Sequence, residues 1–142
     1  MSYYDTNPKR LDLLGHLSFG VQSIAVSQPF YTAVFATLGL SLVYQDNAEK
    51  PRALGYGWGA RSPVNIYEEA KAAAAGAGTH IGFNAPSRKA VDEFYRAALE
   101  HGKKDDGAPG LRKDYHDNDY ACFVYDPDGH RLEAVYQQPL EE

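Results

Sequence analysis

His16-Leu-Ser-Phe-Gly-Val21 and His80-Ile-Gly-Phe-Asn-Ala85 are two copies of one pattern, and this repeat decides the fold. Each copy begins with a histidine, and a Phe-Tyr pair starting at Phe30 or Phe94 follows 14 positions later. The two copies are offset by 64 residues, which indicates a tandem duplication. A pseudo-twofold axis would bring equivalent side chains to one centre, so the paired histidines are candidates for a binding site.

The composition is typical of a globular protein. Hydrophobic residues make up 44% of the 142 residues and charged residues 23%, which excludes a disordered or fibrous class. Halves of about 60 residues lie near the lower limit for a stable core, so we expect the two copies to fold together. We also expect a cytoplasmic protein with no membrane partner, because no apolar run approaches roughly 20 residues and the N-terminus lacks a secretory pattern.

The net charge of −5, with no basic block, argues against nucleic acid and anionic lipid as partners. A small molecule is the better expectation. The single cysteine, Cys122, lies in a run typical of a buried strand, and we interpret its thiol as structural.

The first copy predicts the element order βαβββ, and the second copy repeats its first strand and its helix. In the first copy, alternation predicts strands over 17–21, 40–44, 53–58 and 64–67, with a helix over 30–38 that ends at Gly39. In the second, a strand over 80–85 comes first, a helix capped by Ser87 runs to His101, and strands follow over 120–125 and 131–136. The predicted fold is α+β, with tandem βαβββ modules forming a curved mixed sheet around a central cavity. We divide the chain into an N-terminal arm (1–13), a first module (14–70), a linker (71–79) and a second module (80–138).

Aligning the last strands of the two modules gives an offset of 68, because the second module has four more residues in its loop, and this pairs Asn65 with Glu133. Both have apolar neighbours in their strands, so both should point away from the helix-packed face, as His16 and His80 do. Two imidazoles and a carboxylate are a common minimal ligand set for a divalent ion such as Zn²⁺, Ni²⁺, Fe²⁺ or Mn²⁺. The alternative is a metal-free cavity whose polar groups bond one another, with Arg131 as the ion-pair partner of Glu133.

Five further residues are candidates for the site. Tyr115 and His116 are candidate proton-transfer residues, and Arg112 is a candidate for substrate binding, because long loops often close over ligands. Plain surface polarity explains these three equally well. Tyr56 and Tyr67, like Asn65, could contact substrate in an apolar pocket, although aromatic residues in strands are more often core.

The duplication, the two histidines, the Phe-Tyr pairs and the segment Asp126-Pro-Asp-Gly-His-Arg-Leu-Glu133 resemble the vicinal oxygen chelate superfamily over about residues 14 to 137. That superfamily contains glyoxalase I, extradiol dioxygenases, and bleomycin and fosfomycin resistance proteins. The resemblance implies metal ligands at His16, His80 and Glu133, and a homodimer. Asn65 departs from glyoxalase I, where a glutamate serves as ligand and base.

Three functions remain open. The first is a metal-dependent lyase or isomerase of the glyoxalase type, whose small carbonyl or oxygen-rich substrate chelates the ion. The second is a metal-free drug-binding protein similar to bleomycin resistance proteins. The third is an Fe²⁺-dependent ring-cleaving dioxygenase, which the ligand set also permits.

Overall fold

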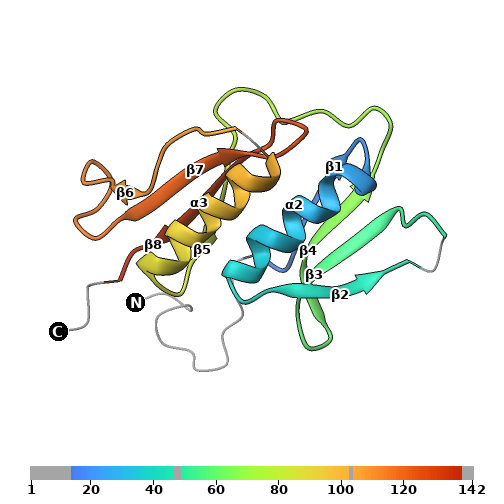
Figure 1. Cartoon of the computed structure of the whole chain (residues 1–142), viewed down its shortest axis with the longest axis horizontal. Coiled ribbons are helices and arrows are strands. Elements are labelled where there is room, and N and C mark those ends of the chain that lie inside the picture. The colour runs from blue at the N-terminus through green and yellow to red at the C-terminus, as the bar shows by residue number, and fades with distance from the viewer. Residues whose placement is uncertain (1–13, 47–48, 103, 139–142) are drawn as a thin grey trace.

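The computed structural model describes residues 14–46, 49–102 and 104–138, and the predicted N-terminal arm lies outside these residues. The described part has two helices and eight strands (Figure 1). The first module contains β1 (Leu17–Val21), α2 (Ile24–Thr37), β2 (Ser41–Gln45), β3 (Ala53–Trp58) and β4 (Arg61–Glu68). The second contains β5 (Ile81–Asn84), α3 (Arg88–Gly102), β6 (Gly110–Leu111), β7 (Tyr120–Tyr125) and β8 (Arg131–Tyr136).

Each module forms its own four-stranded mixed sheet, and the two strand orders match: β1-β4-β3-β2 and β5-β8-β7-β6. The first pair of each sheet, β1 with β4 and β5 with β8, is parallel. The other pairs are antiparallel. Leu17 is paired with Val64 in the first sheet, and Ile81 with Leu132 in the second. These registers reproduce the offsets of 64 and 68 residues, so the predicted α+β duplication is confirmed.

Helix α2 begins earlier than predicted. It carries Pro29 inside, whereas the sequence pattern placed its start after that proline. Two first-turn N–H groups are satisfied: the Ser23 hydroxyl accepts from Val26 N at 3.3 Å, and Glu68 Oε2 accepts from Ile24 N at 3.0 Å. These bonds stabilise the start of the helix, and the second comes from a residue 44 positions away.

The core lies between the sheets and the two helices, which pack side by side (Figure 1). Its largest side chains come from both modules and include Phe30, Phe35 and Phe94, all 0% exposed. Phe35 of α2 packs edge-on against Phe83 of β5, with ring centroids 5.2 Å apart. The modules therefore share one core and cannot bury their apolar faces separately.

The turn between β7 and β8 ties the second module to the first. Asp126 Oδ1 accepts hydrogen bonds from the backbone N–H groups of Asp128 (2.9 Å) and His130 (2.7 Å), and its Oδ2 accepts from the Tyr31 hydroxyl at 2.5 Å. His130 Nε2 donates to the carbonyl of Gly20 at 2.7 Å. Burial raises the pKa of Asp126, and burial followed by the charge of Asp126 raises that of Tyr31. The predicted Asp126-Pro-Asp-Gly129 turn is therefore confirmed, and it also joins the modules.

No helix among the described residues is both long and apolar enough to span a membrane.

Candidate functional site

A hollow of about 350 Å³ lies on the face of the first sheet that points away from α2. His16, Ser18, Asn65 and Tyr67 line it, together with residues 61–63 at the start of β4. Three of its lining residues, Gly15, Ser18 and Ser62, are small. This hollow therefore contains the histidine and the amide that the duplication assigns to the first module.

The amide of Asn65 is held by its own strand. Its Oδ1 accepts from the Ser62 hydroxyl at 3.2 Å, and its Nδ2 donates to the Ser62 carbonyl at 3.1 Å. Both ends of the amide therefore have a partner three residues earlier. Asn65 is oriented without any ligand, and its oxygen still has a second lone pair for a substrate or an ion.

A second hollow of about 310 Å³ lies on the equivalent face of the second sheet. It holds His80 and Glu133, whose Nε2 and Oε1 atoms are 3.4 Å apart. Adjacent parallel strands bring the two side chains together, because Gly82 is paired with Glu133 just as Ser18 is paired with Asn65. A Cβ at Gly82 would lie 2.8 Å from Glu133 Oε1, so the glycine leaves room for the carboxylate.

Glu133 is the more buried member of this pair. Its side chain is 14% exposed, against 38% for His80. Burial raises the pKa of Glu133, the neighbouring His80 opposes that rise, and the charge of Asp119 adds to it. A half-buried carboxylate beside an imidazole is an arrangement that gains from a cation, because a cation would compensate the burial cost.

Arg131 pairs with Asp106 and not with Glu133, the partner that the sequence suggested. Its Nε donates to Asp106 Oδ2 at 2.5 Å, and its guanidinium lies over the ring of Phe123 at 4.5 Å. The hydrogen bond to Asp106 raises the pKa of Arg131. The ion pair considered between Arg131 and Glu133 is therefore not formed, and the close side-chain contact of Glu133 is with His80.

The structure brings His16 together with Asn65, and His80 together with Glu133, but in two separate hollows. Among the described residues, no three of the His, Cys, Asp and Glu side chains lie close enough to hold one metal ion. The candidate ligands of one chain therefore lie in two separate hollows.

The remaining candidates are placed as follows. Tyr67 is 46% exposed in the first hollow, and Tyr115, which lines the second, is 78% exposed. Tyr56 lies in the core, fully buried and 2.9 Å from Thr32 Oγ1, rather than in either hollow. Arg112 stacks over Phe123 at 5.8 Å and donates to the Ala108 carbonyl, while exposed His116 accepts from the backbone of Asn118.

Asp119 and Phe123 are among the residues of the second hollow that sequence reasoning missed. Asp119 is 4% exposed and its Oδ2 accepts from Gln137 at 2.8 Å. Phe123 belongs to a small apolar cluster with Ala121 and Val135 on this face. The alternation of β7 and β8 could have placed Phe123 beside Glu133, because the two residues are directly paired.

The profile of the Glyoxalase/Bleomycin resistance protein/Dioxygenase superfamily matches residues 13–134. A glyoxalase/bleomycin resistance protein from Albidiferax ferrireducens is 28% identical, with a TM-score of 0.71 over 90% of this chain and 100% of that one. Two more distant structures share the fold. A fosfomycin resistance protein from Listeria monocytogenes is 16% identical, with a TM-score of 0.61 over 89% of this chain and 93% of that one. A glyoxalase I mutant from Zea mays is 20% identical, with a TM-score of 0.61 over 88% of this chain and 44% of that one. No curated protein matches the chain significantly.

Proposed function

The chain belongs to the Glyoxalase/Bleomycin resistance protein/Dioxygenase superfamily, and from that premise we propose that it is a metal-dependent enzyme acting on a small carbonyl or oxygen-chelating substrate. The observation that carries the proposal is the His80–Glu133 pair, 3.4 Å apart in a hollow with room kept by Gly82. An imidazole nitrogen and a carboxylate oxygen at that separation are donors that a divalent ion of the Zn²⁺, Ni²⁺, Fe²⁺ or Mn²⁺ type accepts.

We propose that the site is completed by a second copy of the chain. Each chain offers a half-site with His80 and Glu133 and a half-site with His16 and Asn65. In a symmetric dimer, the first hollow of one chain would face the second hollow of its partner, giving two equal sites. His16 would then be the third ligand, and Asn65 a weak ligand or a hydrogen-bond partner of the substrate.

Different residues of the chain would have different roles in the reaction. A divalent ion, when bound, would polarise a substrate oxygen and stabilise the negative charge that develops there. Asn65 has no ionisable group, so it can orient a substrate oxygen but cannot take a proton from carbon. Tyr115 lies at the rim of the second hollow, and we assign to it, with His116 as the alternative, the transfer of a proton to or from the substrate.

Metal content measured by elemental mass spectrometry tests the ligand assignment. We compare untagged protein, prepared without chelators, with Glu133→Gln and with Glu100→Gln, an exposed carboxylate on α3. We expect about one ion per chain in the wild type and Glu100→Gln, and under a tenth of that in Glu133→Gln, because the amide loses the charge but keeps the shape. An unchanged metal content in folded Glu133→Gln would rule out that residue as a ligand.

Mixing two defective variants tests the dimeric site. His16→Ala and Glu133→Gln should each bind no metal alone. If a site uses His16 of one chain and Glu133 of its partner, a mixed dimer has one intact site and one that lacks both ligands. Equal, randomised mixing should then restore about a quarter of the wild-type metal. No recovery after verified subunit exchange would contradict a site shared between chains.

A metal-free binding protein is the second candidate, and the internal hydrogen bonds of Asn65 favour it, because they satisfy the amide without an ion. Tight binding of a cationic drug by protein that takes up no metal would support this candidate. Iron as the bound ion, with oxygen uptake on catechols, would instead support a ring-cleaving dioxygenase.

A further inference from the structure

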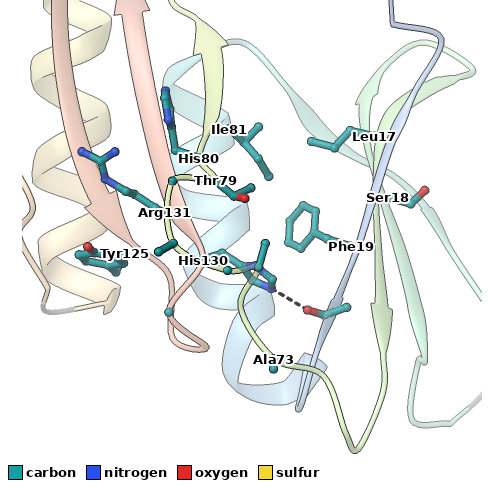
Figure 2. Close-up of a pocket in the computed structure, with 16 residues that line it drawn as sticks. Leu17, Ser18, Phe19, Ala73, Thr79, His80, Ile81, Tyr125, His130 and Arg131 are labelled. Atoms are coloured by element: carbon teal, nitrogen blue, oxygen red, sulfur yellow. Dashed lines mark hydrogen bonds between the residues drawn. The ribbon is translucent and has the colours of Figure 1, made fainter.

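A third and larger cavity, of about 650 Å³, lies at the seam between the two modules (Figure 2). β1 and β5 are edge strands of their sheets and line this seam cavity from opposite sides, without pairing with each other. Residues 73 and 75–79, in the segment that connects the modules, form another wall. A volume of this size is within the range of small-molecule sites, so the seam cavity has room for a ring compound.

Much of the lining is apolar. Figure 2 shows Leu17 on β1 and Ile81 on β5 extending toward one another, with Phe19 beside them. All three side chains are only partly buried. The connecting segment adds alanine or glycine at five lining positions. Apolar surface that faces an open space gains free energy when an apolar molecule fills that space.

The charged residues of the lining already have partners outside the seam. Arg131 Nε donates to Asp106 Oδ2 at 2.5 Å, and its guanidinium lies over the ring of Phe123. His80 Nε2 lies 3.4 Å from Glu133 Oε1. None of the 16 lining residues, all from the described part of the chain, is an aspartate or glutamate. The described lining therefore offers no unpaired carboxylate or guanidinium, and it favours a ligand without net charge, because a charge would be desolvated there without compensation.

His130 supplies a fixed hydrogen-bond acceptor at one end of the seam cavity. It is 8% exposed, its Nε2 lies 2.7 Å from the Gly20 carbonyl, and its ring packs edge-on against Phe19, with centroids 5.0 Å apart. A carbonyl only accepts, so Nε2 carries the hydrogen and Nδ1 of the neutral ring is left as an acceptor.

Nδ1 of His130 is available to a ligand. It has no hydrogen-bond partner among the described residues. It is also not one of their enclosed unpartnered atoms, which are Arg88 Nε and Asp119 Oδ1. Because His130 lines the seam cavity, a donor group of a molecule bound there would satisfy this nitrogen.

We propose that the seam cavity binds a neutral phenol. The aromatic ring lies among the apolar side chains of β1 and β5, and the hydroxyl donates to Nδ1 of His130. A phenol combines an apolar ring with one O–H donor, and the lining is complementary to both parts. This site is separate from the two hollows and requires no metal, so it goes beyond the proposed function.

Isothermal titration of chelator-treated, metal-free protein with 2-naphthol tests the cavity. We expect one saturable site per chain. Figure 2 shows Thr79 directed into the seam cavity, so Thr79→Phe should fill part of it and weaken binding by about tenfold or more. Ala70→Phe, at an exposed position outside the lining, is the control and should stay within about twofold. Absence of saturable binding, or equal binding by Thr79→Phe, would overturn the proposal.

The analogue 2-methoxynaphthalene, which keeps the rings and the oxygen but has no O–H, tests the role of His130. His130→Gln keeps an N–H donor for the Gly20 carbonyl and removes Nδ1. The ratio of the two affinities, naphthol over methoxynaphthalene, should be about fivefold higher in the wild type than in this variant, the effect of one neutral hydrogen bond. An equal ratio in the wild type and folded His130→Gln would refute the hydrogen bond.

Nitrogen NMR of the histidine rings gives a second readout that needs no variant. In wild-type protein, the Nδ1 resonance of His130 should shift when naphthol binds and stay in place when methoxynaphthalene binds, because only naphthol has a hydrogen to donate. A naphthol complex in which this resonance is unchanged would refute the assigned acceptor.

These results separate the two proposals. Naphthol binding by protein that never takes up metal would leave the phenol site standing and remove the metal-dependent function. Metal uptake without naphthol binding would do the reverse.

Discussion

Tyr31→Phe is expected to weaken the junction between the modules, by an amount that depends on pH. The Tyr31 hydroxyl donates to Asp126 at 2.5 Å, and the two residues are 0% and 3% exposed. Removing the donor leaves a carboxylate oxygen without this partner in a buried place, which costs about 2–3 kcal/mol of unfolding free energy. For a domain of this size that corresponds to a decrease in Tm of roughly 6–9 °C.

The pH dependence follows from the pKa of Asp126. Burial raises this pKa above its unfolded value, and the hydrogen bond from Tyr31 opposes the rise. The protonated carboxyl stabilises the folded state fully below the unfolded pKa, and this contribution is lost as pH rises through the higher folded pKa. Tyr31→Phe raises the folded pKa further, so the deficit of the variant is largest above both folded values. Below both folded pKa values it should fall to about 1 kcal/mol, the value of a neutral hydrogen bond.

Urea unfolding followed by circular dichroism, at pH 7.5 and at a pH low enough to protonate Asp126 in both folded proteins, measures both numbers. Tyr56→Phe is the control, because its buried hydroxyl bonds the neutral Thr32 and should cost about 1 kcal/mol at either pH. Asp128 and His130 also act on the pKa of Asp126. Both residues are present in the wild type and in each variant, so their effects largely cancel when the unfolding free energies are compared. A deficit for Tyr31→Phe that is below 1 kcal/mol at pH 7.5, or equal at both pH values, would refute the reasoning.

Three other expectations concern single positions. Burial raises the pKa of Cys122 to about 12, so about one thiol in ten thousand is ionised at pH 8, and Ellman's reagent should react at least 100-fold more slowly with native than with unfolded protein. Gly57→Ala would place a Cβ 2.0 Å from the Arg61 carbonyl oxygen and should cost more than about 3 kcal/mol in urea unfolding. Gly76→Ala, with no described atom within 4 Å of its Cβ, should stay within about 0.5 kcal/mol. Ser87→Ala removes the cap of α3 and should lower its stability by about 1 kcal/mol in the same assay.

Elements set by local patterns could be predicted from the sequence. The strand over 131–136 and the helix that follows Ser87 were predicted within a residue, because alternation and capping are properties of neighbouring residues. The start of α2 was not, because the prediction began the helix after Pro29, whereas the helix includes this proline and begins at the local cap Ser23. The two-residue strand β6 was missed since a polar loop gives no alternation to detect.

The candidate site was likewise predictable only in part. The duplication paired His80 with His16 and Glu133 with Asn65, and the strand registers agree, because register is set within each module. The relative position of the two half-sites depends instead on how α2 packs on α3 and how the modules are joined. That is a tertiary property, and no spacing in the sequence encodes it.

The two hollows differ at one duplicated position, where the first module has the neutral Asn65 and the second has the carboxylate Glu133. In the second module, Glu133 is a half-buried carboxylate with His80 as its neighbour, so it requires a cation or a proton for full compensation. In the first, Asn65 is neutral and Ser62 satisfies both ends of its amide. A folding role alone would be served by an amide in both modules, since an amide is buried at lower cost than a carboxylate. The carboxylate in the second module, with Gly82 leaving space for it, is therefore the feature that supports the proposed cation ligand at this position.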